Sequence, residues 1–89
     1  MIERREFLLR ARLDAATLEV FVAEGWIVQT DGLTEADLAR ACLVRDLRDA
    51  MGVNDEGVSV ALDLLDQLHA TRAALKRTVE ALRAAEGEQ

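Results

Sequence analysis

Apolar residues recur every three or four positions along most of the chain, and this spacing predicts helices. We expect a first helix over about Glu3 to Ala11 and a second over about Ala15 to Glu24. Three apolar positions of the second helix follow the i, i+3, i+4 spacing of a buried face: Leu18, Phe21 and Val22. Asp14 directly precedes this helix, where its carboxylate can accept hydrogen bonds from free backbone amides, so we expect it to be the N-cap.

The next segment contains the single β-like run of the sequence, Trp26 to Gln29, which ends at the turn signal Asp31-Gly32 and is interpreted as one arm of a small wing. Thr34 and Asp37 have the spacing of a capping box and open a third helix, predicted over about Glu35 to Met51. The residues expected on the buried face of the third helix are Leu38, Cys42, Leu43, Leu47, Ala50 and Met51.

A fourth helix is predicted from about Asp55 to Ala85, with Asn54 as its N-cap. At about 1.5 Å per residue it is roughly 45 Å long, so its far half must project beyond the first three helices. Steps of four and three residues mark a heptad seam of Ala61, Leu65, Leu68, Arg72, Leu75, Val79 and Leu82. This seam predicts a two-chain helical homodimer, and the alternative is an amphipathic helix folded back on its own domain.

Charge is distributed unevenly along the 89 residues, whose net charge is −6. No Lys or Arg occurs from Leu13 to Ala39, and the acidic residues of this base-free block are Asp14, Glu19, Glu24, Asp31, Glu35 and Asp37. Arginines precede and follow the block. Because affinity for the nucleic-acid backbone comes from neutralising phosphates, such a block argues against a nucleic-acid contact through the second helix.

Four segments follow the order of helix, tight turn, helix, short wing, helix and long helix: Thr17-Leu18, Glu24-Gly25-Trp26-Ile27, Leu33-Thr34-Glu35-Ala36-Asp37-Leu38 and Met51-Gly52-Val53-Asn54-Asp55-Glu56-Gly57-Val58. In this order and in these residues the chain resembles proteins of the MerR type. The resemblance implies an all-α, winged helix-turn-helix (MerR-like) fold with a long C-terminal dimerisation helix. Residues 1–53 would form the helix-turn-helix head with a truncated wing, and residues 54–89 the long helix of a dimeric coiled coil.

The alternative function is therefore that of a MerR-type DNA-binding transcriptional regulator. Its DNA contact would be assisted by the bases of the first helix, namely Arg4, Arg5, Arg10 and Arg12. The MerR type usually has a basic recognition helix, but the corresponding segment here reads Leu18-Glu19-Val20-Phe21-Val22-Ala23-Glu24. These acids should repel the duplex over a Debye length of about 8 Å at physiological salt. We expect DNA binding to have been lost.

A narrower resemblance is carried by Glu6-Phe7-Leu8, Gly25-Trp26, Arg45-Asp46-Leu47, Met51 to Val58 and Val60 to Leu68. In these residues the chain is more similar, within this superfamily, to the chaperone-modulator (CbpM-like) family. This resemblance implies a small, acidic homodimer that binds the J domain of a DnaJ-like, DNA-binding co-chaperone. It further implies inhibition, because such modulators block the stimulation of the Hsp70 ATPase by the co-chaperone.

A J domain is expected to present a basic helix to Hsp70, so an acidic surface can compete for the same face through complementary potential. The partner-binding candidates are Glu19, Val20, Ala23, Glu24, Trp26 and Asp31, with Asp63 and Asp66 as a second acidic edge. The alternative for the acids is a solvated face without a partner. For Trp26 the alternative is a supporting role in the core or the wing.

Residues suited to catalysis or metal binding are few. His69 is the single histidine, and its spacing from Asp63 and Asp66 turns the three side chains progressively around a helix. Cys42 cannot form an internal disulfide and suits a small core position. We therefore expect no enzyme activity, no metal and no cofactor. The acidic N-terminal residues and the absence of a long apolar run predict a cytoplasmic protein without a membrane segment.

Overall fold

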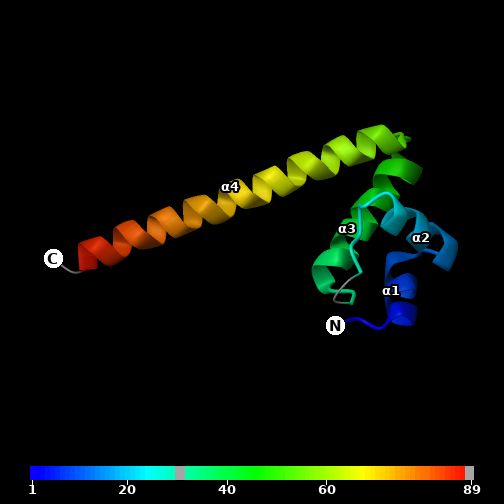
Figure 1. Ribbon diagram of the computed structural model, residues 1–89, viewed down its shortest axis with the longest axis horizontal. Coiled ribbons are helices and arrows are strands. Elements are labelled where there is room, and N and C mark those ends of the chain that lie inside the picture. The colour runs from blue at the N-terminus through cyan, green and yellow to red at the C-terminus, as the bar shows by residue number, and fades with distance from the viewer. Residues whose placement is uncertain (30–31, 88–89) are drawn as a thin grey trace. The chain divides into compact units, whose positions relative to one another are not determined.

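The computed structural model describes residues 1–29 and 32–87, and these residues form helices joined by short connections (Figure 1). The elements are α1 (Arg4–Ala11), α2 (Ala15–Ala23), α3 (Glu35–Arg45), the π-helical turn η1 (Asp46–Ala50) and α4 (Asp55–Gly87). The predicted helical class is confirmed. The chain divides into two compact units, Met1–Ser59 and Val60–Gln89, which are described separately below.

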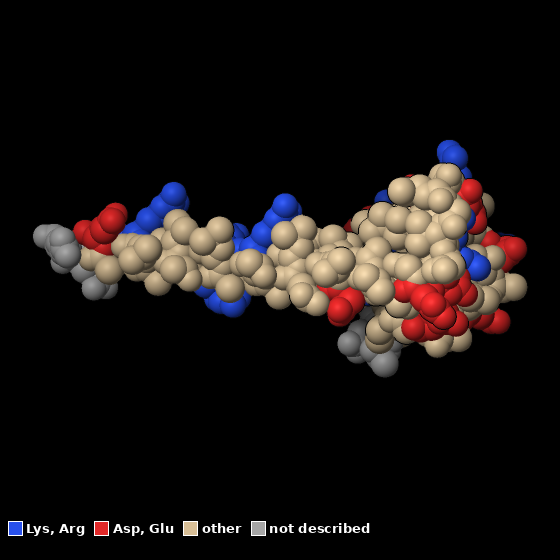
Figure 2. All heavy atoms as spheres, turned by 90° about the horizontal axis from the view of Figure 1, so that it is seen from above, with Lys and Arg blue, Asp and Glu red and all other residues tan. Residues whose placement is uncertain are grey.

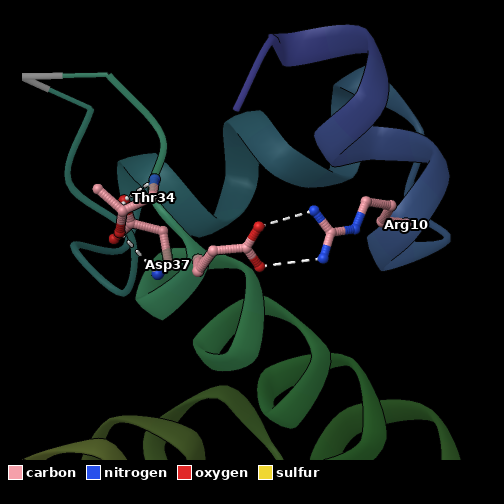
Figure 3. Close-up of polar contacts among 4 residues, drawn as sticks. Arg10, Thr34 and Asp37 are labelled. Atoms are coloured by element: carbon pink, nitrogen blue, oxygen red, sulfur yellow. Dashed lines mark hydrogen bonds and ion pairs between the residues drawn. The ribbon is translucent and has the colours of Figure 1, made fainter. Parts of the chain in front are cut away.

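Side-chain caps explain where three of the helices begin. Asp14 Oδ1 accepts a hydrogen bond of 2.7 Å from the Thr17 amide at the start of α2. Thr34 and Asp37 form a reciprocal capping box at the start of α3, as Figure 3 shows. Asn54 Oδ1 accepts from the Gly57 amide at 2.8 Å at the start of α4. All three predicted caps are confirmed, because each depends only on residues within one turn.

The predicted wing arm is not a strand. Trp26 and Ile27 are buried, and the backbone amides of both donate to the carbonyl oxygen of Phe21, so they complete the end of α2. Among the described residues the β pairing is a single antiparallel bridge between Ile2 and Leu33. Residues 30 and 31 lie outside the described residues, as does the part of the predicted wing that they would form.

The core of the first unit is built from α1, α2, α3 and the start of α4. Its fully buried side chains include Phe7, Leu18, Phe21, Ile27, Val44 and Val58. Ala11 of α1 and Ala41 of α3 are also fully buried, and these small side chains allow the two helices to approach closely.

The buried face of the third helix differs from the prediction. Its buried residues are Leu38, Ala41 and Val44, whereas Cys42 and Leu47 are half-buried and Leu43, Ala50 and Met51 are exposed. The prediction was wrong for Leu43 and Met51 because it gave large apolar side chains more weight than alanine, and for Ala50 because it continued the α-helical spacing beyond Arg45. Close packing against α1 selects the small Ala41 instead.

The third helix also ends differently from the prediction, which had one regular helix to Met51. The α-helical part stops at Arg45 and the chain continues as η1, where the Met51 amide donates to the Asp46 carbonyl over five residues at 3.1 Å. Gly52 then adopts a φ of 67°, and the Val53 amide returns to the Leu47 carbonyl at 2.8 Å. The positive φ explains the glycine at this helix end.

The second unit consists of α4 from Val60 onward, a single uninterrupted helix that extends to Gly87 rather than to the predicted Ala85. Leu62 is buried, while Leu64, Leu68, Leu75 and Leu82 are exposed. Across the described residues, neither α4 nor any shorter helix combines the length and apolarity required to cross a bilayer.

Candidate protein-interaction surfaces

The outward face of α2 carries four of the predicted partner-binding residues. Glu19, Val20, Ala23 and Glu24 are all exposed, and Val20 has 41% of its surface accessible although it is apolar. We call these four residues the α2 surface. Leu18 and Phe21 on the opposite side of the same helix are buried, so the apolar spacing of α2 orients the two acids toward solvent.

No Lys or Arg belongs to α2, and the nearest base with a described contact to it comes from α1. Arg4 Nη2 lies 4.0 Å from Glu19 Oε1, and both side chains are well exposed. An exposed pair at this distance contributes little to stability and leaves Glu19 accessible. The α2 surface is therefore acidic at both ends of a small apolar centre.

Trp26, a further predicted residue of this patch, does not join the α2 surface. Trp26 is only 3% exposed, and its Nε1 donates to Ser59 Oγ at 2.9 Å. Its ring lies edge-on to Phe21, with centroids 5.6 Å apart and planes at 61°. Trp26 is thus a core residue, because its indole has both an aromatic neighbour and a hydrogen-bond acceptor inside the first unit. This is the alternative that the sequence analysis left open. Asp31 lies outside the described residues.

The second predicted acidic edge lies on α4 in the second unit. Asp63 and Asp66 are exposed, and Asp63 Oδ2 accepts a hydrogen bond of 3.1 Å from Gln67 Nε2 one turn later. His69 is exposed as well. In residues 1–29 and 32–87 no group of three or more His, Cys, Asp or Glu side chains is arranged to hold a metal ion.

The predicted dimerisation seam follows one side of α4. Ala61, Leu65 and Val79 are half-buried, while Leu68, Arg72, Leu75 and Leu82 are exposed, Leu75 by 63%. A shallow groove in the second half of the helix is lined by Arg72, Leu75, Lys76, Val79, Glu80 and Arg83. Figure 2 shows Lys and Arg side chains standing along this part of α4. The seam is therefore an apolar stripe with bases beside its second half.

The bases of α1 that would assist a DNA contact are partly engaged by acids. Arg10 forms a two-pronged ion pair with Glu35 of α3, with Nη1–Oε1 and Nη2–Oε2 distances of 2.9 and 3.0 Å (Figure 3). The hydrogen bonds from Arg10 hold the pKa of Glu35 below its ordinary value, and those same bonds raise the pKa of Arg10. The Arg10 guanidinium is therefore held against the Glu35 carboxylate by two parallel hydrogen bonds.

Replacing Arg10 with Gln should move the pKa of Glu35 upward toward its ordinary value, because the hydrogen bonds to the carboxylate are lost. A carboxyl with a depressed pKa in the folded state favours folding above its unfolded pKa, and this contribution disappears as pH falls through the folded pKa. An NMR titration of the Glu35 side chain in both proteins measures the change. Arg5→Gln removes the same charge from α1 and is the control; an equal shift in that variant would contradict the specific pairing.

Arg48 is an important residue that the sequence interpretation missed. Its Cζ lies 5.6 Å from the centroid of Phe21 and 5.9 Å from that of Trp26, and its Nε is 3.4 Å from Asp55 Oδ1. The available signal was its spacing of four and seven residues from Val44 and Ala41, which places a base on the buried side of the third helix.

Comparison of the chain with protein-family models, with curated proteins and with solved structures found no match.

Proposed function

We propose that the protein is a non-enzymatic chaperone modulator that binds the J domain of a DnaJ-like co-chaperone and blocks its stimulation of Hsp70. In this proposal the first unit is a MerR-type winged helix-turn-helix head that contacts a protein instead of DNA, and the molecule acts as a cytoplasmic homodimer. The observation that carries the proposal is the α2 surface, an outward helix face with two acids, an exposed valine and no base.

The charge of the α2 surface favours a basic protein over DNA. Glu19 and Glu24 occupy exposed positions on the helix that a MerR-type regulator would direct at the duplex. A DNA contact needs Lys or Arg to neutralise phosphates, and α2 supplies none. Arg10 of α1 is already held by Glu35, which further lowers the positive potential available to a phosphate backbone.

Both components of the α2 surface suit a basic helix as the partner. The acids at either end provide complementary potential, which raises the association rate and selects the partner. Val20 and Ala23 between them provide apolar area that is removed from water on binding, at about 25 cal/mol per Å². A J domain, with the basic helix it is expected to present to Hsp70, has the required chemistry.

The homodimer in this proposal is supported by the exposed seam of α4. Acids lie in the first part of the helix beyond residue 60, at Asp63 and Asp66, whereas Arg72, Lys76 and Arg77 lie in the second part. An antiparallel pair of α4 helices would bring the acidic part of each copy opposite the basic part of the other. A parallel pair would instead bring like charges together, so charge favours the antiparallel arrangement.

The proposal is tested by calorimetric titration of the full-length protein with an isolated J domain of a DnaJ-like protein from the same cell, at about 0.15 M salt. The double variant Glu19→Lys/Glu24→Lys should weaken binding by about tenfold or more, because two attractive charges become repulsive. Asp49→Lys/Glu86→Lys makes the same charge change at exposed positions outside the α2 surface and the seam, and is the matched control.

A DNA shift assay run beside the titration addresses the alternative function. Binding of the J domain without a shifted duplex is the expected result. A shifted duplex with a steep dependence on salt, together with no heat from the J domain, would replace the modulator by the DNA-binding regulator. Equal loss of binding in both double variants would remove the α2 surface from the proposal.

A further inference from the structure

Trp26 contacts residues of three elements of the first unit, namely α2, α3 and the start of α4. Its ring packs edge-on against Phe21 at the end of α2, and its Nε1 donates to Ser59 Oγ near the start of α4. Its backbone carbonyl accepts a hydrogen bond from Nε of Arg40 on α3. These contacts link the end of α2 and α3 to the start of α4.

Arg48 completes this connection. Its guanidinium lies over the rings of both Phe21 and Trp26, at 5.6 and 5.9 Å, where the faces of the rings attract a cation. Its Nε lies 3.4 Å from Asp55 Oδ1 in the first turn of α4. The Arg48 side chain is half-buried, so water screens these interactions less than it would on an open surface.

The π-helical turn η1 determines where Arg48 and the following segment lie. Because a π turn contains more residues than an α turn, it rotates the chain after it relative to α3. The chain then passes through Gly52, with its positive φ, to the cap Asn54 and to Asp55. π-helical turns are found frequently at functional sites.

We propose that Arg48 couples α2 to the first turns of α4, so that a ligand on the α2 surface changes the order of the start of α4. Phe21 and Val20 are neighbours on one helix, and Val20 faces solvent while Phe21 supports the Arg48 guanidinium. A shift of α2 therefore changes the Arg48–Asp55 and Trp26–Ser59 contacts together. The identity of the ligand rests on the proposed function, whereas the coupling of α2 to the start of α4 can be measured in the protein without a ligand.

The coupling is tested by native-state hydrogen exchange of Asp55→Asn and Glu56→Gln in the full chain. Each variant removes one negative charge from the first turn of α4, so the effect on the helix dipole is matched. Of these two acids, Asp55 forms the described ion pair with Arg48. We expect Asp55→Asn to speed the exchange of the Phe21 and Val22 amides on α2 by about two- to fivefold and to shift the fluorescence of Trp26. Glu56→Gln should leave both unchanged, and equal α2 exchange in the two variants would overturn the coupling.

Arg48→Lys provides a second measurement that does not depend on Asp55. Lysine keeps the charge beside Asp55 but lacks the planar guanidinium over the two rings. We expect faster exchange at Val58 and Ser59 together with a shifted Trp26 emission. Unchanged exchange at the start of α4 in this variant would overturn the role of Arg48.

The effect of a ligand on the start of α4 is measured with the J domain at saturating concentration. In the unsubstituted protein it should slow exchange at Val58 and Ser59, and in Asp55→Asn this additional protection should be lost. A J domain that binds without protecting the start of α4 would overturn this effect of the ligand. A J domain that fails to bind would instead overturn the proposed function, and the exchange comparison between Asp55→Asn and Glu56→Gln would still decide the coupling.

Discussion

Replacing Leu75 with Glu should convert the proposed homodimer to a monomer. Leu75 is 63% exposed in the single chain, so a carboxylate there is solvated and leaves the helix intact. In a paired seam the same carboxylate would be taken out of water without a partner, which costs several kcal/mol. Leu68→Glu, one seam position earlier, should have the same effect. Sedimentation at micromolar concentration measures the mass directly.

Ala70→Glu is the matched control for the seam. It introduces the same charge into the same part of α4, but residue 70 lies on the side of the helix opposite the heptad positions. The dimer should persist in this variant. An unchanged mass for Leu68→Glu and Leu75→Glu would reject the seam, and a monomer in all three variants would indicate a general effect of charge on association.

Phe21→Ala should unfold much of the first unit at physiological temperature. Phe21 is fully buried and contacts both Trp26 and the guanidinium of Arg48, so its loss leaves a cavity at the centre of the head. Truncation of a buried phenylalanine to alanine typically costs about 3–5 kcal/mol. A unit that ends at Ser59 has a small core, and a loss of this size removes most of its stability.

Chemical denaturation followed by Trp26 fluorescence measures the effect of Phe21→Ala. The midpoint should fall strongly, with little change in the slope with denaturant. Val20→Ala, the neighbouring substitution on the exposed side of α2, should change the midpoint only slightly. A small effect of Phe21→Ala would contradict its central position in the core.

The elements that sequence predicted well are those determined by neighbouring residues. Asp14, Asn54 and the Thr34–Asp37 pair start their helices through contacts within one turn, so their residue types were sufficient. The same holds for the long helix, whose apolar spacing continues without a breaking residue. Local chemistry therefore predicted the order and the starts of the helices.

The features that sequence missed depend on contacts between distant segments. The propensity of Trp26 and its neighbours favours a strand. In the structure the Trp26 indole instead donates a hydrogen bond to Ser59, thirty-three positions away. The choice of Ala41 for the buried face of α3 depends on how closely α1 approaches, and no periodicity reveals that. The spacing of Arg48 places it on the buried side of the third helix, but the two aromatic rings that it contacts come from other segments and are known only from the structure.

The candidate surfaces also combine features that the sequence predicts with features that depend on contacts between distant segments. Exposure of Glu19, Val20 and Glu24 follows from the amphipathic spacing of α2, which sequence can measure. The pairing of Arg10 with Glu35 joins α1 to α3, and it is visible only once the two helices lie side by side. Sequence therefore indicated which acids face solvent but not which bases they neutralise.

The unequal lengths of the helices have a consequence for the order of folding. α1, α2 and α3 contain 8, 9 and 11 residues, whereas α4 contains 33. Isolated helices shorter than about 12–15 residues are marginal in water, so the three short helices form only as they pack together. α4 alone is long enough to nucleate and persist by itself, on a timescale of about a microsecond. The second unit can therefore be helical, and competent to meet another chain, before the head has folded.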